Sequence, residues 1–465
     1  MNRGGLQPGS FGSRRAEWLV QTPLLLGSFV GTLSNNIVNV PLKQIMGGLH
    51  VPLSLGFLVV VSFNVTFAAL MPVTGWAGDH FGRRRVFCAA LAALAVGSAG
   101  AAVAPNLTLL VAFRVIQGAA TAAILPNVMA LTTQIYGPAR RGRGLGLWSA
   151  ANGLGQATAP LLSGALAGWL SWRAIFWPSV PVAIIGLIAA LRLVPETPPG
   201  RSAIEWRGAS SITLGAGLLL SAAAMAPVGG TALIVGAPMA VAGLVSMGMY
   251  VRASHRFDPP FLPPSLLSEP SFLRSSVAVI AQMFCFAAVM LAVPLNLAAG
   301  SGVSPAAVGL YLFALPATMT VLSPLSGVAI DVFGPRRTIR LGLSILAAAL
   351  AGLGVLLNHP AHASLALIAL LVMAGCGVAM VQTPAATGAT RSTAGRLGAG
   401  IGLFNLLRFA GSALGGCWVA AVLSSGDLYG PLFAGCTAVA LVGLGATWAG
   451  TTPAAESAST EAAAI

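Results

Sequence analysis

Long apolar runs, separated by short segments that carry most of the charge, dominate this chain. A helix needs about 20 apolar residues to span the hydrocarbon core of a bilayer. Fourteen runs suit such helices, and they cover residues 18–40, 53–76, 86–104, 107–133, 145–168, 174–194, 208–226, 231–251, 272–299, 306–329, 339–357, 363–386, 397–423 and 431–451. Backbone polar groups have no water to bond in lipid, so each run is expected to satisfy its own backbone as a helix. The sequence therefore predicts an all-α polytopic membrane protein with 14 transmembrane helices.

Composition supports this prediction and argues against other classes of protein. The chain is 56% hydrophobic and only 7% charged, whereas soluble domains carry about 25% charged residues. Its net charge of +14 comes from arginines in small clusters between apolar runs, which is typical of cytoplasmic loops and not of a nucleic-acid-binding surface. The five cysteines lie within or at the ends of these runs and show no metal-ligand spacing. We expect no nucleic acid, metal or cofactor, and the first run is too long for a cleavable signal peptide.

The placement of basic residues predicts the orientation in the membrane. With the N-terminus inside, 20 of the 24 Lys and Arg residues lie in cytoplasmic segments, whereas the outer loops hold only Lys43 and Arg173. A bias of this kind sets membrane topology. Arg207 and Arg252 flank the seventh and eighth runs on the same side, so this pair of runs is expected to cross the membrane and return.

A charged, glycine-containing segment between the second and third runs has a second copy between the tenth and eleventh. Both copies place Gly, Asp and Gly at the same spacing, and arginines follow each copy. We call these segments the signature loops; they contain Gly75, Asp79, Gly82, Arg83 and Arg84 in the first copy and Gly327, Asp331, Gly334 and Arg336 in the second. A single copy is compatible with an ordinary turn, but two copies in register indicate a transporter built by duplication.

The duplication predicts two pseudosymmetric six-helix bundles joined by a central two-helix hairpin. The expected units are a cytoplasmic tail (1–17), an N-terminal bundle (18–194), the hairpin (208–251), a C-terminal bundle (272–451) and a disordered cytoplasmic tail (452–465). Linkers rich in proline and arginine separate the hairpin from both bundles.

The first signature loop resembles the helix 2–3 loop of the major facilitator superfamily, Gly-x-x-x-Asp-x-x-Gly-Arg-Lys/Arg. The 14-span layout resembles the drug/proton antiporter branch of that superfamily. The resemblance implies that the loop is a latch, with Asp79 at the N-terminus of another helix, where the helix dipole favours a carboxylate. The expected partner of Asp79 is the segment 396–402, and that of Asp331 is the segment 143–146.

The fourth and fifth runs carry two further motifs. Arg114, Gln117 and Gly118 resemble the family pattern Arg-x-x-Gln-Gly, and an arginine inside a span is a functional candidate by default. The open alternative is that Arg114 only ties helices together. The fifth run resembles the antiporter signature Gly-x-x-x-Gly-Pro-x-x-Gly-Gly at Gly155, Ala159, Pro160 and Gly164. That resemblance implies export, although a helix kinked by proline and packed through small residues explains the same pattern.

The first run departs from the family pattern, because Ser34 stands where the family carries aspartate. All ten acidic residues lie in loops, tails or span ends, so no carboxylate is expected at mid-membrane to carry a proton. The candidates for the transport pathway are polar residues inside spans: Ser34, Asn36, Asn39, Arg114, Gln117, Asn127, Asn152, Gln156, Gln282, Gln382, Asn405 and Arg408.

We expect a monomeric, multi-pass transporter of the inner (plasma) membrane that exports small amphipathic organic molecules such as drugs, antibiotics or secondary metabolites, with coupling to protons. The missing intramembrane carboxylate keeps a gradient-driven facilitator or importer open as the alternative. No nucleophile–base pair or phosphate loop supports an enzyme. Because the two charges within spans are Arg114 and Arg408, the expected substrates are neutral or weakly acidic.

Overall fold

The structure is a computed structural model that describes residues 14–196, 206–225, 231–254, 269–300, 303–358, 365–390, 397–426 and 428–448. Within these residues the secondary structure is entirely helical. The N-terminal helices are α1 (Arg14–Asn36), α2 (Leu42–Leu49), α3 (Leu53–Gly56), α4 (Leu58–Phe81), α5 (Arg83–Ala102), α6 (Leu107–Trp169), the 3-10 helix η1 (Trp172–Phe176) and α7 (Ser179–Leu193). The remaining helices are α8 (Trp206–Met225), α9 (Thr231–Ser254), α11 (Pro270–Gly300), α12 (Pro305–Phe333), α13 (Pro335–Leu357), α14 (Leu365–Thr390), α15 (Leu397–Leu423) and α16 (Tyr429–Ala446).

Twelve helical segments of the described chain are long and apolar enough to cross a membrane. They correspond to twelve of the fourteen expected spans. The other two, residues 18–40 and 145–168, lie mainly in α1 and in the second half of α6, which are helical but less apolar. Both segments carry amides and small residues that face other helices or the interior, as described below. The chain is therefore a multi-pass helical membrane protein, whereas the count of fourteen and the cytoplasmic N-terminus stay predictions.

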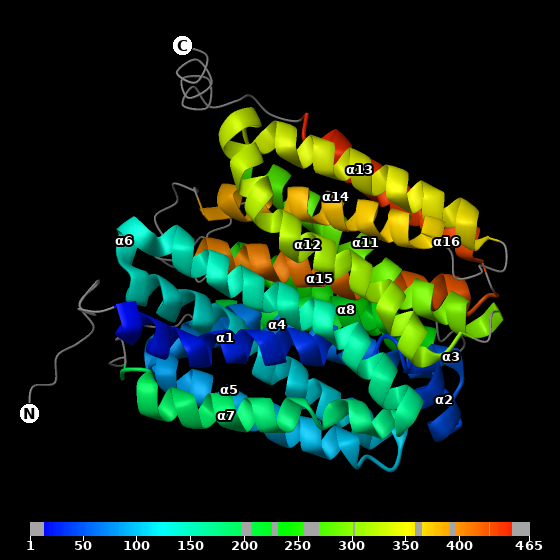
Figure 1. Ribbon diagram of the computed structural model, residues 1–465, viewed down its shortest axis with the longest axis horizontal. Coiled ribbons are helices and arrows are strands. Elements are labelled where there is room, and N and C mark those ends of the chain that lie inside the picture. The colour runs from blue at the N-terminus through cyan, green and yellow to red at the C-terminus, as the bar shows by residue number, and fades with distance from the viewer. Residues whose placement is uncertain are drawn as a thin grey trace, which may run out of the picture.

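The backbone of α6 is helical throughout, but the chain reverses direction between Tyr136 and Gly144. A Cβ atom built on Gly144 would lie 2.7 Å from Cγ2 of Thr132. Twelve residues of a straight helix would separate these positions by about 18 Å. Figure 1 shows the same reversal at the end of the molecule labelled α6. The two arms of α6 are therefore two neighbouring rods, as the fourth and fifth apolar runs predict.

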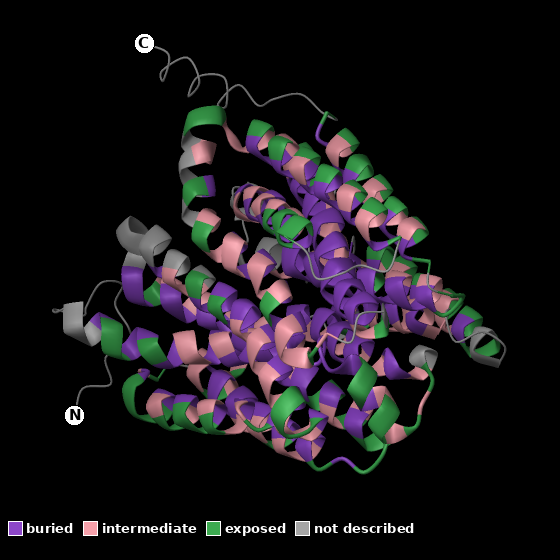
Figure 2. Cartoon of the chain, turned by 45° about the vertical axis from the view of Figure 1, so that its right-hand side comes forward, coloured by how far each residue is buried: buried purple, intermediate pink, exposed green. Residues whose placement is uncertain are grey.

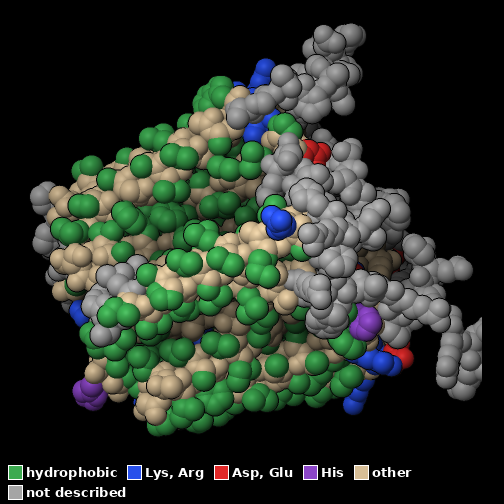
Figure 3. Space-filling view, turned by 180° about the vertical axis from the view of Figure 1, so that it is seen from behind, with side chains coloured by type: hydrophobic (Ala, Val, Ile, Leu, Met, Phe, Trp, Pro, Cys, Tyr) green, Lys and Arg blue, Asp and Glu red, His purple; other side chains and the backbone are tan. Residues whose placement is uncertain are grey.

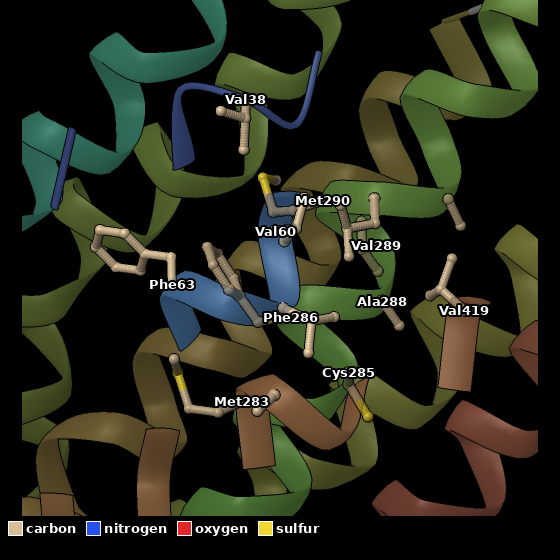
Figure 4. Packing of buried hydrophobic residues seen from close by; sticks show 14 of the residues in the cluster. Val38, Val60, Phe63, Met283, Cys285, Phe286, Ala288, Val289, Met290 and Val419 are labelled. Atoms are coloured by element: carbon tan, nitrogen blue, oxygen red, sulfur yellow. The ribbon is translucent and has the colours of Figure 1, made fainter. Parts of the chain in front are cut away.

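The N-terminal helices and the helices from α11 onward form two groups that lie side by side, the first in the lower part and the second in the upper part of Figure 1. Buried residues concentrate along the middle of the assembly and exposed ones along its outside (Figure 2). Helix α11 runs through this centre, and 83% of its most apolar window is buried. Met283, Phe286 and Met290 of α11 lie near Val60 and Phe63 of α4 in the core (Figure 4). One apolar core thus joins the two groups.

The outside of the bundle is apolar. Large hydrophobic side chains such as Ile185, Val245 and Val442 are exposed on α7, α9 and α16. Figure 3 shows hydrophobic side chains over most of one broad face, with charged residues mainly toward its ends. Such a surface suits lipid rather than water, because soluble proteins rarely expose apolar patches this extensive.

The central hairpin packs against both groups. Helix α8 contacts α4 and α15, and it buries residues at helical spacing: Ala209, Ile212, Ala216, Leu220 and Ala224. Helix α9 crosses α8 closely, since a Cβ on Gly215 would lie 3.2 Å from the carbonyl oxygen of Gly243. Only 17% of the apolar window of α9 is buried. The hairpin therefore spans the junction between the two groups and presents α9 to the lipid.

Candidate functional site

A central cavity lies between the two groups of helices. About 820 Å³ of empty space, open solvent included, lies between its walls. The walls come from α1, α4 and α6 on one side and α11, α14 and α15 on the other. Helix α1 and the second arm of α6 contribute amides to it, among them Asn36, Asn152 and Gln156. The two groups therefore share one internal space, as a transport pathway between two bundles requires.

Seven of the twelve pathway residues expected from the sequence line this cavity: Asn36, Asn39, Asn152, Gln156, Gln382, Asn405 and Arg408. Several of their amide donors are used within their own helices, as in the bond from Asn36 Nδ2 to the Thr32 carbonyl (3.1 Å) and that from Asn152 Nδ2 to the Trp148 carbonyl (3.1 Å). The amide oxygens of Asn39 and Asn152 have no hydrogen-bond partner within the described structure. The cavity thus presents free acceptors on its N-terminal wall.

Aromatic and sulfur-containing side chains make up the apolar walls. Phe67 of α4 and Phe409 of α15 meet with ring centroids 4.0 Å apart, so they join the two groups at the cavity. Phe286 and two methionines of α11, Met283 and Met290, complete this surface. Polarisable, adaptable side chains of this kind suit ligands of varied shape.

Sequence reasoning missed part of the lining. Asn64 lies in the cavity wall, is 4% exposed, and its amide oxygen has no partner among the described residues. Asn64 is a lone amide in the run at 53–76, and the sequence alone does not show whether such a residue lines a cavity or contacts a helix. Thr32, Trp148 and the aromatic walls carry no sequence signal that separates them from ordinary packing residues.

Arg114 lies in a separate buried cluster and does not line the cavity. Its Nε donates to the Val59 carbonyl (2.9 Å), and its Nη1 donates to the Ser34 carbonyl (2.7 Å) and to Gln117 Oε1 (2.7 Å). Its guanidinium also lies 4.3 Å from the centre of the Phe63 ring. These bonds connect α6 to α1 and α4, and they satisfy a buried cation without any carboxylate.

Ser34 and Gln117 complete that cluster. The Ser34 hydroxyl donates to Ser179 Oγ (3.1 Å), which connects α1 to α7, and Gln117 Nε2 donates to Ser98 Oγ (3.0 Å), which connects α6 to α5. Asn127 lies elsewhere again and donates to the Ala123 carbonyl (2.8 Å). The structure therefore brings together seven of the twelve expected pathway residues at the cavity. Of the other five, Ser34, Arg114 and Gln117 join helices of one group.

In the first signature loop, Gly82 has φ 95° and ψ 124°, a conformation that only glycine adopts without strain. This residue ends α4 and begins α5. Asp79 forms an ion pair with Arg83 across the turn. Arg84 Nη2 donates to the Leu191 carbonyl at the C-terminal end of α7, and Arg84 Nη1 lies 3.4 Å from Glu196 Oε1.

The second signature loop repeats this arrangement. Gly334 has φ 78° and ψ 157° and joins α12 to α13. Arg336, at the position equivalent to Arg84, donates from Nε to the Thr447 carbonyl (2.8 Å) and from Nη2 to the Trp448 carbonyl (3.0 Å). Each loop thus places an arginine at the C-terminal end of the last helix of its group, where the helix dipole favours a cation.

The expected latch partners lie partly outside the described residues. Arg396 is one of these, and the side chains of Arg143 and Asp331 and the surroundings of Gly327 are not described either. The contact of either aspartate with the opposite group therefore stays a prediction.

The glycines of the fifth-run motif pack on two different neighbours. A Cβ on Gly155 would lie 2.5 Å from the Phe29 carbonyl oxygen of α1. A Cβ on Gly164 would lie 3.1 Å from the carbonyl carbon of Pro305 in α12, which belongs to the other group. Ala159 is fully buried, and Pro160 is next to it in α6. The motif therefore wedges the second arm of α6 between its own group and the opposite one.

Within the described residues no cluster of three or more His, Cys, Asp or Glu side chains could hold a metal. Among the described residues, no carboxylate lines the cavity. The polar chemistry of the site consists of amides, hydroxyls, one indole N–H and the guanidinium of Arg408.

Comparison with known proteins agrees with this geometry. The model of the Major Facilitator Superfamily matches residues 24–268 and 275–464. An uncharacterized MFS-type transporter of Mycobacterium tuberculosis is 29% identical over 88% of this chain and 71% of its own length. The drug efflux pump JefA of the same organism is 27% identical over 86% of this chain and 79% of its length. The tetracenomycin C resistance and export protein of Streptomyces glaucescens is 27% identical over 80% of this chain and 69% of its length.

Proposed function

The chain belongs to the major facilitator superfamily of membrane transporters, and from this premise we propose that it exports small amphipathic organic molecules by alternating access. The observation that carries the proposal is the central cavity. It is built from both groups of helices, it is lined by aromatic and sulfur-containing walls, and it offers a small number of polar atoms. A site of this composition suits ligands that are largely apolar and carry a few polar groups.

Movement of the two groups against each other would open the cavity to either side of the membrane. The groups touch closely where α6 crosses α12 and where Lys43 Nζ donates to the Ala298 carbonyl (3.0 Å). These contacts lie away from the signature loops, because Ala298 and Pro305 are at the ends of α11 and α12 remote from Gly334. We propose that the signature loops hold the other end and release it during transport.

Export is the direction that the relatives favour. Two of them are named as a drug efflux pump and as a resistance and export protein, and the motif at Gly155–Gly164 resembles the antiporter signature. We therefore propose drugs, antibiotics or secondary metabolites as the substrate class. The remaining features of this proposal are fourteen spans, a cytoplasmic N-terminus, a monomeric state and a place in the plasma membrane.

The energy source is proposed to be the proton-motive force, with proton coupling as in the antiporter branch. A second candidate is a facilitator or importer that runs on the substrate gradient alone. One observation favours this alternative, namely that no carboxylate lines the described cavity to carry a proton.

Accumulation of a compound panel in cells with and without the protein distinguishes these functions. The panel should include matched neutral, anionic and cationic aromatic compounds, and each should be measured with and without a protonophore. Export predicts lower accumulation in cells that contain the protein, and the protonophore should abolish the difference. A facilitator predicts faster equilibration that the protonophore does not change.

A further inference from the structure

Arg408 of α15 is a buried cation that the described protein leaves without a hydrogen-bond partner. The residue is 9% exposed and lines the central cavity. Its Nε is fully buried and makes no hydrogen bond within the described structure. The contact recorded for its guanidinium is with an aromatic ring, that of Phe409, whose centre lies 5.0 Å away. A ring contact of this kind uses the face of the guanidinium and leaves the N–H donors along its edge available.

Arg114 shows how this chain satisfies a buried arginine that has a structural role. Its donors reach two carbonyls at 2.9 and 2.7 Å and an amide oxygen at 2.7 Å. Arg408 has no comparable set of acceptors, although it is buried to nearly the same degree. A charge removed from water without compensation is strongly unfavourable. The contrast indicates that the compensating group of Arg408 comes from outside the described protein.

Acidic side chains of the described protein do not fill this role. Asp79 pairs with Arg83 and Glu196 lies beside Arg84, both at the end of the bundle that carries the first signature loop. No acidic residue is among those that line the cavity. An anionic ligand is therefore the group that would complete the site.

Other unsatisfied atoms define the rest of the ligand. Asn39, Asn64, Asn152 and Gln382 line this cavity, and their amide oxygens are buried without partners among the described residues, as is the indole N–H of Trp148. Amide oxygens accept hydrogen bonds, so they would bind hydroxyl groups. The paired rings of Phe67 and Phe409 offer an aromatic surface.

We propose that Arg408 is the specificity-determining residue of the cavity and binds the carboxylate or phenolate of an aromatic organic acid that also carries hydroxyl groups. A guanidinium suits this task because its fork of donors matches a carboxylate in a two-bond arrangement. The proposal rests on the proposed transport function, since it assigns the substrate class of the same cavity. It narrows the expected neutral or weakly acidic substrates to the acidic ones.

Binding of three matched probes to the purified full-length protein tests this assignment. The probes are 1-pyrenebutanoate, 1-pyrenebutanol and 1-pyrenebutylammonium, which share one aromatic body and differ in charge. Wild-type protein should bind the carboxylate at least about tenfold more tightly than the alcohol, a difference of about 1.4 kcal/mol, and the ammonium compound most weakly. Equal binding of all three, or preference for the ammonium compound, would overturn the assignment without any variant.

Three variants locate the preference. Arg408→Gln should bring binding of the carboxylate down to that of the alcohol, and the affinity for the alcohol should change less than about twofold. Arg408→Lys should retain part of the preference, because lysine keeps the charge but lacks the planar fork. Arg252→Gln, which removes an exposed arginine of α9, should behave as wild type. An undiminished carboxylate preference in Arg408→Gln would contradict the proposal.

Transport of the same probes into inverted membrane vesicles separates this proposal from the function on which it rests. Uptake of all three probes without preference would leave the exporter intact and refute the anion site. Tight binding of the carboxylate without transport of any probe would support the site and refute the proposed export. We expect wild-type vesicles to take up the carboxylate probe fastest. In Arg408→Gln, only the uptake of the carboxylate probe should be lost.

Discussion

Gly164 and Gly309 face each other where the second arm of α6 crosses α12. A Cβ on Gly309 would lie 3.4 Å from the Cα of Gly164 and 2.9 Å from the carbonyl carbon of Pro160. A Cβ on Gly164 would lie 3.2 Å from the Cα of Gly309. The two backbones therefore approach as closely as small residues allow. Because the helices belong to opposite groups, this crossing is where we expect the groups to pivot or slide.

Enlarging either glycine should therefore impair transport more than insertion into the membrane. Overpacking of a tight contact costs about 1–3 kcal/mol, so Gly164→Leu and Gly309→Leu should stabilise states in which the groups are further apart. We expect transport to fall at least about tenfold at equal membrane levels, a loss that about 1.4 kcal/mol would produce. Gly248→Leu is the matched control, because a Cβ on Gly248 of α9 meets no atom within 4 Å. Normal transport by both crossing variants would show that the contact does not limit the movement.

Arg114→Gln should destabilise the protein. The change leaves the Ser34 carbonyl and the Gln117 amide oxygen without the donor that Arg114 supplies, and each orphaned buried group costs about 1–3 kcal/mol. Thermal unfolding of the purified protein, followed by loss of the monodisperse peak in gel filtration, should shift to lower temperature. Arg408→Gln provides the comparison, because it breaks no hydrogen bond within the described structure. An equal or larger shift in Arg408→Gln would contradict the division between a structural arginine and a ligand-binding one.

Arg336→Gln should loosen the C-terminal end of α16. Arg336 binds the Thr447 and Trp448 carbonyls at 2.8 and 3.0 Å, and a cation at a helix C-terminus contributes about 0.3–1 kcal/mol. A small decrease in unfolding temperature is expected. The neighbouring Arg337→Gln should have no such effect, since Arg337 is exposed and makes no hydrogen bond to another described residue. Equal behaviour of the two variants would argue against the capping role.

Asp79→Asn should reduce transport strongly while leaving the folded protein in the membrane. The carboxylate of Asp79 is about half exposed and pairs with Arg83, and an exposed pair contributes only about 0–1 kcal/mol to stability. Any large loss of transport would therefore report on the latch and not on folding. Asp331→Asn should be milder, because Pro335 stands where the first copy has Arg83. Glu196→Gln, which removes another carboxylate near the same loop, should transport normally; wild-type rates in Asp79→Asn would exclude the latch.

The topology prediction concerns the two linkers that flank the central hairpin, which lie outside the described residues. Cysteines placed at Ser202 and Ser268 of a cysteine-free version should resist an impermeant thiol reagent added to intact cells. The same cysteines should react once the membrane is permeabilised, which controls for accessibility. Labelling of either in intact cells would overturn the fourteen-span arrangement.

Much of the fold could be predicted from the sequence, because apolar length and duplicated glycines are strong local signals. The two copies of the signature predict equivalent segments, and Gly82 and Gly334 both adopt positive φ. The less apolar segments 18–40 and 145–168 are predicted to span the membrane from their length and from the loops around them. Their lower apolarity has a physical reason, since α1 and the second arm of α6 supply amides to the cavity.

The division of polar residues between cavity and helix contacts could not be predicted. In a transmembrane helix that is apolar on all sides, the spacing of apolar residues does not show which face points into the bundle. The sequence therefore ranked Arg114 and Arg408 alike, whereas one is bound by carbonyls and the other lines the cavity. Asn64 was missed for the same reason, because a single amide among apolar neighbours does not indicate which way it points.

Uptake of 1-pyrenebutanoate into proteoliposomes under a potassium diffusion potential tests the central claim most directly. An anion that moves without a counter-ion gains about 2.3 kcal/mol per 100 mV, so an exporter of organic acids can use the membrane potential without an intramembrane carboxylate. Valinomycin and an inward potassium gradient make the interior positive. Wild-type protein should then accumulate the probe above its external concentration, whereas Arg408→Gln and protein-free liposomes should not. No protein-dependent accumulation of the probe under this potential, or equal accumulation by Arg408→Gln, would contradict the account.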